Sequence, residues 1–350
     1  MNPMLGRVAD DHGAEPAFGG ISLTHEEGRS LRVAWAGTEL FRYVYGPWEP
    51  QIESPRPYLH PVRTLRGHLV STYRPHDHVW HKGISWALCN VGPDNFWGGP
   101  TYLTGEGYRQ LANNGTMRHE ALGPLDLGPQ GVSFTERLRW ITQPGHPCIA
   151  ERRRVAVRIH PAAGTWQLAF ETCMTNISGG TLAFGSPTTR GRPDAGYGGL
   201  MWRGPRSFAD GKVLFPGGSG GDELMGTRSP WMAFAGRHDG YGTASTLVLC
   251  DSPRNFCAPT QWFARATPFA AICPAPFFAA ERPLGPGESL TLRYDVFVAD
   301  GVLDVPGCEA LADLARHTEL LAPSPGAGRG GRETVPSPAG MPATRREARD

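Results

Sequence analysis

Three histidines fall within six residues and form the densest polar cluster of the chain. They are His76, His78 and His81, and Asp77 lies among them. An imidazole can transfer protons near neutral pH without a large pKa shift, and a carboxylate can orient it. On a strand, His76 and His78 would point to the same face because side chains alternate, with His81 following after a bend. We therefore predict acid–base roles for His78 and His81, with Asp77 orienting an imidazole.

The same histidines could instead bind a metal. Two or three imidazoles together with a carboxylate hold divalent cations. A cupin-type oxygenase would place a Glu a few residues after an H-x-H pair, but residues 82–86 contain no carboxylate. His76, His78 and His81 are thus metal ligands under an alternative interpretation, while the leading one predicts no cofactor.

Aromatic and arginine side chains are the candidates for holding a substrate. Rings are concentrated around the histidines, and aromatic rings stack on the C–H faces of pyranoses, although any single ring could equally fill a core. A glycine-rich stretch over 189–205 adds arginines, which bind carboxylate or phosphate oxygens bidentately. We predict that the substrate contacts come from Arg63, Trp97, Arg190, Asp194, Trp202 and His238.

Other catalytic signatures are missing from the sequence. It contains no H-E-x-x-H and no P-loop. The glycines of 189–205 do not form G-x-G-x-x-G between a strand and a helix, which argues against a dinucleotide site.

The elements that must position these residues are predicted to be strands. Gly and Pro together make up more than a fifth of the 350 residues, which suits short strands joined by many turns. Apolar residues alternate with polar ones in 31–35, 134–140, 155–159, 166–170 and 290–298, with a possible irregularity in the second segment. Helical spacing occurs in 308–321.

We therefore expect an all-β chain built on a large antiparallel β-sandwich. The sandwich domain should span residues 21–300, followed by a short C-terminal helix within 301–321. Residues 1–20 are predicted to be a flexible leader. Residues 322–350 consist mainly of Pro, Gly, Ala, Ser and Arg, which cannot bury enough surface to offset ordering entropy, so a disordered tail is expected.

Composition limits the partners and the location. The net charge of +1 provides no field for attracting nucleic acids. No apolar run reaches the roughly 18 residues of a membrane span, and the first 16 residues lack the apolar region of a secretory signal. Seven cysteines without a C-x-x-C pair predict buried reduced thiols. We expect a cytoplasmic protein with a small-molecule partner, and the oligomeric state stays open.

Several motifs resemble the bacterial PmoA-like family. They are R-P-Y-L-H-P-V-R-T at 56–64, D-H-V-W-H-K-G at 77–83, N-F-W-G-G at 95–99, G-G-L-M-W-R-G-P at 198–205 and P-A-P-F-F at 274–278. The resemblance covers about residues 20–300. The family carries the label "methane oxygenase PmoA" and otherwise counts as a domain of unknown function. A membrane methane monooxygenase subunit would need apolar spans that this sequence lacks.

The PmoA-like family looks related in architecture to galactose-mutarotase-like supersandwiches. The segment L-G-P-G-E-S-L at 284–290 is similar to the entry to their closing strand. In mutarotases a His acts as acid and a late Glu as base on the anomeric hydroxyl and ring oxygen of a sugar. The resemblance implies His78 or His81 as the acid and Glu281 as the base.

Together these features predict a carbohydrate-active protein, most simply an acid–base enzyme of epimerase, isomerase or lyase type. A metal-dependent oxidoreductase with the histidines as ligands is one alternative. A non-catalytic sugar-binding module is the other.

Overall fold

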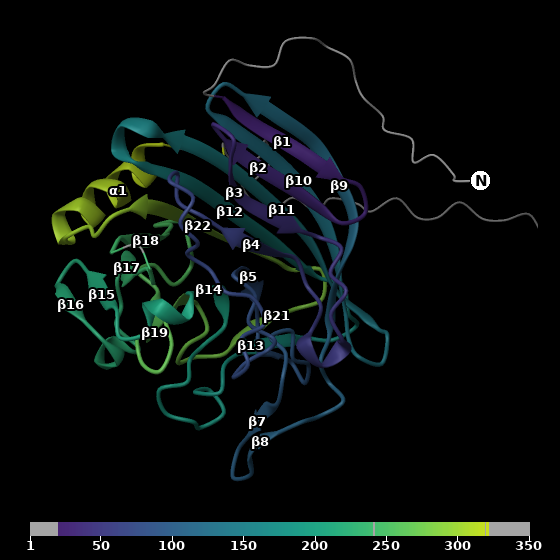
Figure 1. The fold of residues 1–350 in the computed structure, drawn as a ribbon. Helices are drawn as coiled ribbons and strands as arrows, with labels where there is room; N and C mark the ends of the chain where they lie inside the picture. Colours follow the sequence, from purple (N-terminus) through teal and green to yellow (C-terminus); the bar gives the residue numbers. More distant parts are fainter. Residues whose placement is uncertain (1–19, 241, 319, 322–350) are drawn as a thin grey trace, which may run out of the picture.

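The computed structural model describes residues 20–240, 242–318 and 320–321 (Figure 1). The predicted tail and all of the predicted leader except Gly20 lie outside the described residues. Two large antiparallel sheets dominate the described part, which confirms the prediction of an all-β antiparallel sandwich. The predicted strands at 31–35, 134–140, 155–159, 166–170 and 290–298 all lie within strands of these two sheets.

The larger sheet has nine strands and contains the longest strands of the chain. In spatial order they are β16 (Gly218–Gly220), β15 (Lys212–Phe215), β17 (Trp231–Arg237), β18 (Ala244–Asp251), β22 (Ser289–Asp300), β12 (Thr165–Asn176), β11 (Pro147–His160), β10 (Gly131–Ile141) and β9 (Thr116–Gly128).

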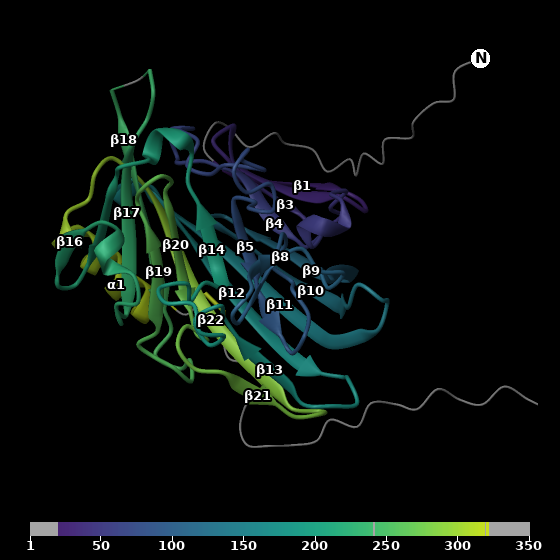
Figure 2. The ribbon, with the colours of Figure 1, turned by 90° about the horizontal axis from the view of Figure 1, so that it is seen from below.

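The second large sheet has eight strands, drawn from both ends of the domain. Their order is β1 (Ile21–Glu26), β2 (Ser30–Trp35), β3 (Thr38–Val44), β4 (Tyr58–Val62), β5 (Ile84–Ala87), β14 (Gly199–Arg203), β20 (Ala271–Ala275) and β19 (Gln261–Arg265). Seen from below, its strands lie in a layer beside those of the nine-stranded sheet (Figure 2).

Smaller elements complete the described chain. A three-stranded sheet joins β21 (Arg282–Leu284), β13 (Leu182–Gly185) and β6 (Asn90–Val91). A hairpin of β7 (Thr101–Leu103) and β8 (Gly107–Arg109) projects from one end of the sandwich (Figure 1). Short 3-10 turns cover Gln51–Glu53, Pro161–Ala163, Arg206–Phe208 and Asp222–Leu224.

The main hydrophobic core fills the space between the two large sheets. Trp86 of β5 and Trp202 of β14 enter it from the eight-stranded sheet, and Leu168 of β12 and Val296 of β22 enter from the nine-stranded sheet. Each of these four side chains is fully buried. Burying one such side chain stabilises the fold by roughly 1.5–3 kcal/mol, so the alternating apolar pattern determines which face of each strand points inward.

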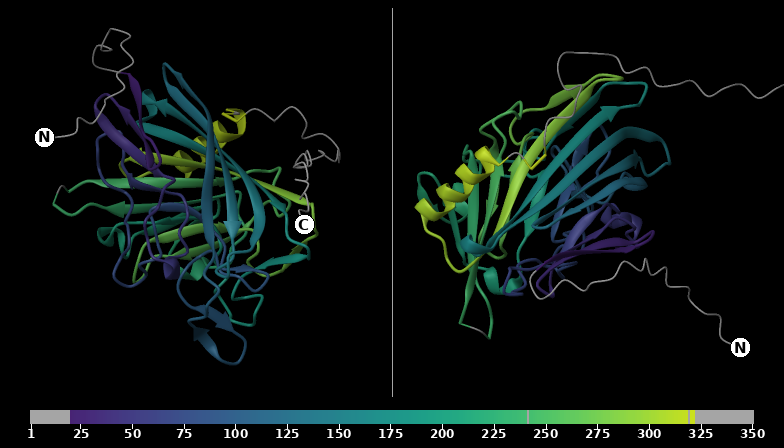
Figure 3. Two further views of the ribbon diagram at one scale, coloured as in Figure 1. Left: turned by 90° about the vertical axis from the view of Figure 1, so that its right-hand side faces the viewer. Right: turned by 90° about the horizontal axis from the view of Figure 1, so that it is seen from above.

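The C-terminal helix α1 (Val305–His317) covers the outer face of the nine-stranded sheet (Figure 3). Cys308 and Leu311 pack there against Val248 and Phe297. A helix was predicted here, but it begins earlier and ends earlier than its apolar spacing over 308–321 suggests. The Asp304 side chain accepts a hydrogen bond from the backbone N–H of Gly307 and so starts the helix with a cap.

The eight-stranded sheet also has an occupied outer face. Residues that alternate with the core residues form a second apolar cluster there, which includes Ala87 of β5, Met201 of β14, Phe263 of β19 and Cys273 of β20. Trp97, from the connection between β6 and β7, joins this cluster. The candidate site is built on this outer face.

The seven cysteines are all unpaired; five are buried, as predicted, while Cys173 and Cys257 are half-buried. Among the described residues, no helix has the length and apolar character needed to cross a membrane.

Candidate functional site

A cavity of about 410 Å³ opens on the outer face of the eight-stranded sheet. Met201 and Phe263 contribute to it from β14 and β19, and loops supply most of the rest. Its aromatic lining consists of Trp80, Trp97, Tyr108, Tyr197, Phe263 and Phe269. Its ionisable side chains are His78, His81, Tyr108, Arg192, Asp194, Tyr197 and Arg265.

The histidine segment is a pair of tight turns, so the prediction that His76 and His78 share one face of a strand is wrong. The backbone N–H of His78 donates to the carbonyl of Pro75, and that of His81 donates to the carbonyl of His78. These turns leave His76 exposed and away from the cavity. They bring the rings of His78 and His81 together instead, with centroids 4.7 Å apart and planes 9° from parallel.

His81 is held as a neutral hydrogen-bond donor. Its Nδ1 lies 2.8 Å from Nη1 of Arg203. A guanidinium only donates, so Nδ1 accepts and the proton must sit on Nε2. Burial of the ring is the main cause that lowers the pKa of His81 well below its usual value, and the nearby His78 and Arg203 act in the same direction.

His78 is held in the opposite tautomer. Its Nδ1 lies 2.8 Å from Oδ2 of Asp77, and because an ionised carboxylate only accepts, Nδ1 carries the proton. In the neutral ring, the lone pair is then on Nε2. Burial would raise the pKa of Asp77, but hydrogen bonds from Arg203 and His78 outweigh it and hold that pKa well below its usual range.

Arg203 connects the two histidines. Its Nη2 lies 3.0 and 2.8 Å from the carboxylate oxygens of Asp77, while its Nη1 reaches His81. The guanidinium also lies 3.8 Å from the centre of the Phe269 ring. We did not select Arg203 from the sequence, although it lies in the glycine-rich stretch 189–205. The available signal was its spacing, because it stands two residues after Met201 and therefore on the same face of β14.

Trp97 reaches the cavity because a turn directs it there. Oδ1 of Asn95 accepts hydrogen bonds from the backbone N–H groups of Trp97 and Gly98, at 2.8 and 3.0 Å. This side chain fixes the turn. The Trp97 ring then meets the His81 ring edge-on, with centroids 5.5 Å apart. The structure therefore brings the predicted residues His78, His81, Asp77 and Trp97 together.

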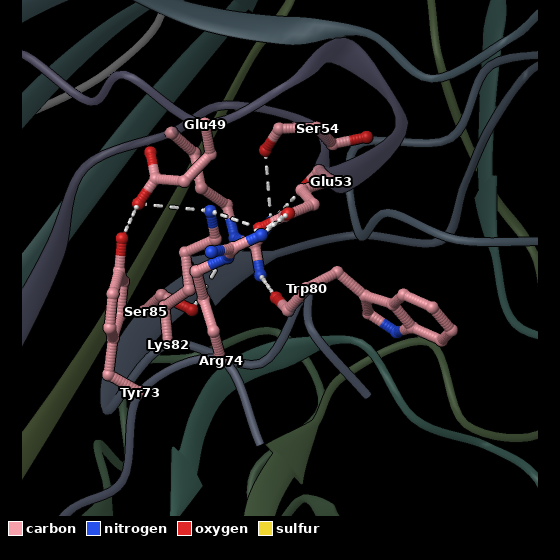
Figure 4. A network of polar contacts seen from close by, with 9 residues as sticks. Glu49, Glu53, Ser54, Tyr73, Arg74, Trp80, Lys82 and Ser85 are labelled. Atoms are coloured by element: carbon pink, nitrogen blue, oxygen red, sulfur yellow. Dashed lines mark hydrogen bonds and ion pairs between the residues drawn. The ribbon is translucent and has the colours of Figure 1, made fainter. Parts of the chain in front are cut away.

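A network of charged side chains adjoins the histidine segment through Arg74 and Lys82 (Figure 4). Nζ of Lys82 lies 3.1 Å from a carboxylate oxygen of both Glu49 and Glu53. Arg74 forms a second ion pair with Glu53 at 2.8 Å. Burial and the charge of the neighbouring Arg56 lower the pKa of Lys82 to about 8, against the opposing effect of the two glutamates.

This network anchors both ends of the histidine segment. Arg74 begins the segment and Lys82 follows His81, and both are bound to Glu53. Between them, Arg56 donates to the backbone carbonyl of Trp80 at 2.7 Å. A polar network whose groups are paired in this way is rigid. It therefore holds in place the turn that carries His78 and His81.

The loop over 188–197 closes another side of the cavity. Asp194, a predicted substrate contact, lines it together with Arg192 and Tyr197. Arg190, another predicted contact, lies outside this lining and forms an ion pair with Glu281 at 3.3 Å. Glu281, predicted from the resemblance as a base, is likewise outside the lining.

Three further predicted contacts lie away from the histidines. Trp202 is fully buried in the main core, where its Nε1–H donates to the carbonyl of Val70, because it alternates with Met201 along β14. Arg63 and His238 lie together in a separate cavity of about 410 Å³, which also contains His68 and Asp239.

The structure gives the predicted metal ligands no common centre. Among the described residues, no three His, Cys, Asp or Glu side chains are placed to hold a metal ion together. His76 is exposed and does not line the cavity. Nδ1 of His81 is occupied by the Arg203 guanidinium, whose charge would also repel a cation. A divalent metal stays an untested alternative to the prediction of no cofactor.

Comparisons with known proteins give distant similarities. No curated protein matches the chain. Among solved structures, it is similar to an α-galactosidase from Lactobacillus brevis, with 11% identity, a TM-score of 0.36, and coverage of 80% of this chain and 39% of that one. The chain thus spans about two fifths of that enzyme. The match to a galactose 1-epimerase from Lactobacillus acidophilus has 8% identity, a TM-score of 0.36, and coverage of 81% and 100%.

A third similar structure is a putative aldose 1-epimerase from Klebsiella pneumoniae, with 11% identity, a TM-score of 0.31, and coverage of 87% of this chain and 85% of that one. A family model matches the sequence over residues 30–313, from β2 into α1, and so includes every wall of the cavity. The chain belongs to this family of unknown function, DUF6807.

Proposed function

We propose that the chain is an acid–base enzyme of epimerase, isomerase or lyase type acting on a sugar or a sugar-derived small molecule. The observation that carries the proposal is the pair of stacked histidines with opposite tautomers. Asp77 leaves Nε2 of His78 as a proton acceptor, and Arg203 leaves Nε2–H of His81 as a donor. One cavity wall therefore offers a base beside a hydrogen-bond donor.

This pair suits removal of a proton from carbon next to a carbonyl group. Nε2 of His78 takes the proton, and the electron pair of the C–H bond moves toward the carbonyl oxygen. The Nε2–H of His81 stabilises the negative charge that develops on that oxygen. Return of the proton completes an epimerisation or isomerisation, and expulsion of a leaving group completes an elimination. Neither outcome requires an oxidant.

The surroundings of the pair favour a sugar-like substrate. Six aromatic rings line the cavity, and its volume of about 410 Å³ lies within the range of small-molecule sites. Asp194 adds an exposed carboxylate that can accept hydrogen bonds from hydroxyl groups. We assign the role of base to His78 rather than to Glu281, because Glu281 is paired with Arg190 outside the cavity lining.

The first experiment measures hydrogen exchange in D2O. The purified protein is incubated with a panel of aldoses, ketoses and uronates, and loss of C–H signals is followed by proton NMR. We expect His78→Gln and His81→Gln each to lower the exchange rate by about 10²–10⁴-fold, the usual contribution of a positioned acid or base.

The matched control is His76→Gln, which removes an exposed imidazole of the same segment. It should exchange at the wild-type rate. Equal rates in wild type, His78→Gln and His81→Gln would refute the proposal. Ligand binding without any conversion would favour the non-catalytic sugar-binding alternative.

A further inference from the structure

We propose that the ligand of the cavity is a sugar acid and that Arg192 binds its carboxylate. The inference rests on the proposed function, because it places the ligand in the same cavity and names its class. The supporting observation is which of the three guanidinium groups around that cavity are paired with a carboxylate of this chain.

Two of the three guanidiniums are already neutralised by carboxylates of this chain. Arg203 binds Asp77 at 2.8 Å, and Arg265 lies 3.4 Å from Asp222. Arg192 is different. It lines the cavity, yet among the described residues no carboxylate lies within ion-pair distance of it. Its charge is therefore available to a ligand.

The Arg192 side chain is held in place without being neutralised. It donates a hydrogen bond to the phenol oxygen of Tyr108, and its guanidinium lies 4.8 Å from the centre of that ring. The phenol groups of Tyr108 and Tyr197 are in turn 3.0 Å apart. A guanidinium that is held on an aromatic ring is preorganised, so it loses less conformational entropy when it binds a carboxylate.

The rest of the cavity selects the kind of anion. Asp194 follows Arg192 by two residues and lines the same cavity, but the two form no ion pair. One free guanidinium beside one free carboxylate suits a singly charged ligand that also carries hydroxyl groups, and it disfavours a doubly charged phosphate. A sugar carboxylate meets both requirements, because its acid group can bind Arg192 while its hydroxyls donate to Asp194.

The test compares acidic sugars with their neutral counterparts. Binding of glucuronate and galacturonate, and of glucose and galactose, is measured by calorimetry at low and high salt. We expect the uronates to bind at least about tenfold more tightly than the neutral sugars, with a preference that weakens as salt rises. Arg192→Gln should abolish that preference for uronates over neutral sugars.

The matched control is Arg190→Gln, on the same loop but paired with Glu281 and outside the cavity lining. It should keep the preference for uronates. Thermal unfolding of both variants identifies any general loss of folding. Equal affinities for acidic and neutral sugars, no uronate binding, or a preference that survives in Arg192→Gln would each overturn the inference.

The two experiments distinguish a failure of the acid–base function from a failure of the sugar-acid inference. Exchange of a neutral sugar that depends on His78, without a preference for uronates, would leave the acid–base function and remove the inference. Uronate binding that depends on Arg192, without any exchange, would leave the sugar-acid ligand and remove the acid–base function.

Discussion

Arg203 favours different tautomers in two chemically identical side chains. One of its nitrogen atoms donates to Nδ1 of His81, while another holds the carboxylate that accepts from Nδ1 of His78. The two Nε2 atoms are therefore fixed as a donor and an acceptor before any ligand enters. Because the donor and the acceptor are already oriented, they need little rearrangement when charge develops in the transition state.

The ammonium group of Lys82 is the shared partner of two buried carboxylates, so its removal should destabilise the fold. The variant Lys82→Met leaves Glu49 and Glu53 without their shared ammonium group. We expect the free energy of unfolding to fall by about 3–5 kcal/mol, because breaking a buried pair strands a desolvated charge. Urea unfolding at pH 7 measures the change.

The control for this prediction is Arg29→Met, which removes an exposed ion pair with Glu26. Exposed pairs contribute about 0–1 kcal/mol, so this variant should remain close to wild type. A loss for Lys82→Met no larger than that for Arg29→Met would show that the network does not stabilise the histidine segment.

The connection between β6 and β7 depends on a glycine at a point of close contact. Gly99 has a φ of +68°, and a Cβ atom there would lie 2.6 Å from the Trp80 ring. Gly99→Ala should therefore displace a wall of the cavity and lower the free energy of unfolding by about 1–3 kcal/mol. Urea unfolding and calorimetric ligand binding measure the two effects.

Gly105→Ala is the matched control, because Gly105 has a similar φ of +79° but no atom within 4 Å of a built Cβ. It isolates the cost of the backbone conformation, which is about 1 kcal/mol. Ligand affinity should fall in Gly99→Ala and stay unchanged in Gly105→Ala. Identical behaviour of the two variants would mean that contact with Trp80 is not the cause.

Individual strands could be predicted from the sequence because alternation is a local property. The alternation was expected to be irregular within 134–140. In the structure, β10 shifts its register against β9 there, beside Glu136. That carboxylate points inward and binds Tyr43 and His119. These two partners are distant from Glu136 in sequence. The local pattern therefore indicated that the alternation is interrupted but could not indicate why.

The candidate site was predictable in part for the same reason. His78, His81, Asp77 and Trp97 lie within 21 residues, and their side-chain types alone suggested them. Arg203 reaches Asp77 across 126 residues of sequence, through the pairing of β14 with β5. No local pattern encodes that pairing. The cytoplasmic location, the lack of a cofactor and the PmoA-like resemblance stay predictions.

The sandwich as a whole should lose stability in mild acid. Burial lowers the pKa of His60 to about 4, with a smaller contribution from Arg63, whereas an unfolded histidine has a pKa near 6.5. Between these values the unfolded chain binds a proton that the native chain does not, so the free energy of unfolding falls as the pH drops from 6.5 to 4. Burial of His81 acts in the same direction.

This prediction is checked by urea unfolding at pH 7 and pH 5. His60→Gln cannot gain the proton, so it should lose about 1–2 kcal/mol less than wild type over this interval. A wild-type stability that is constant over the interval, or an equal loss in both proteins, would contradict it.

The alternation along β14 has a consequence for how this family can diverge. Leu200 and Trp202 face the core, while Met201 lines the cavity and Arg203 binds His81 and Asp77 beside it. Selection for folding and selection for ligand chemistry therefore act on different, interleaved positions of one strand. Descendants of a common ancestor can change what they recognise by substitutions at every second residue and inherit the architecture unaltered.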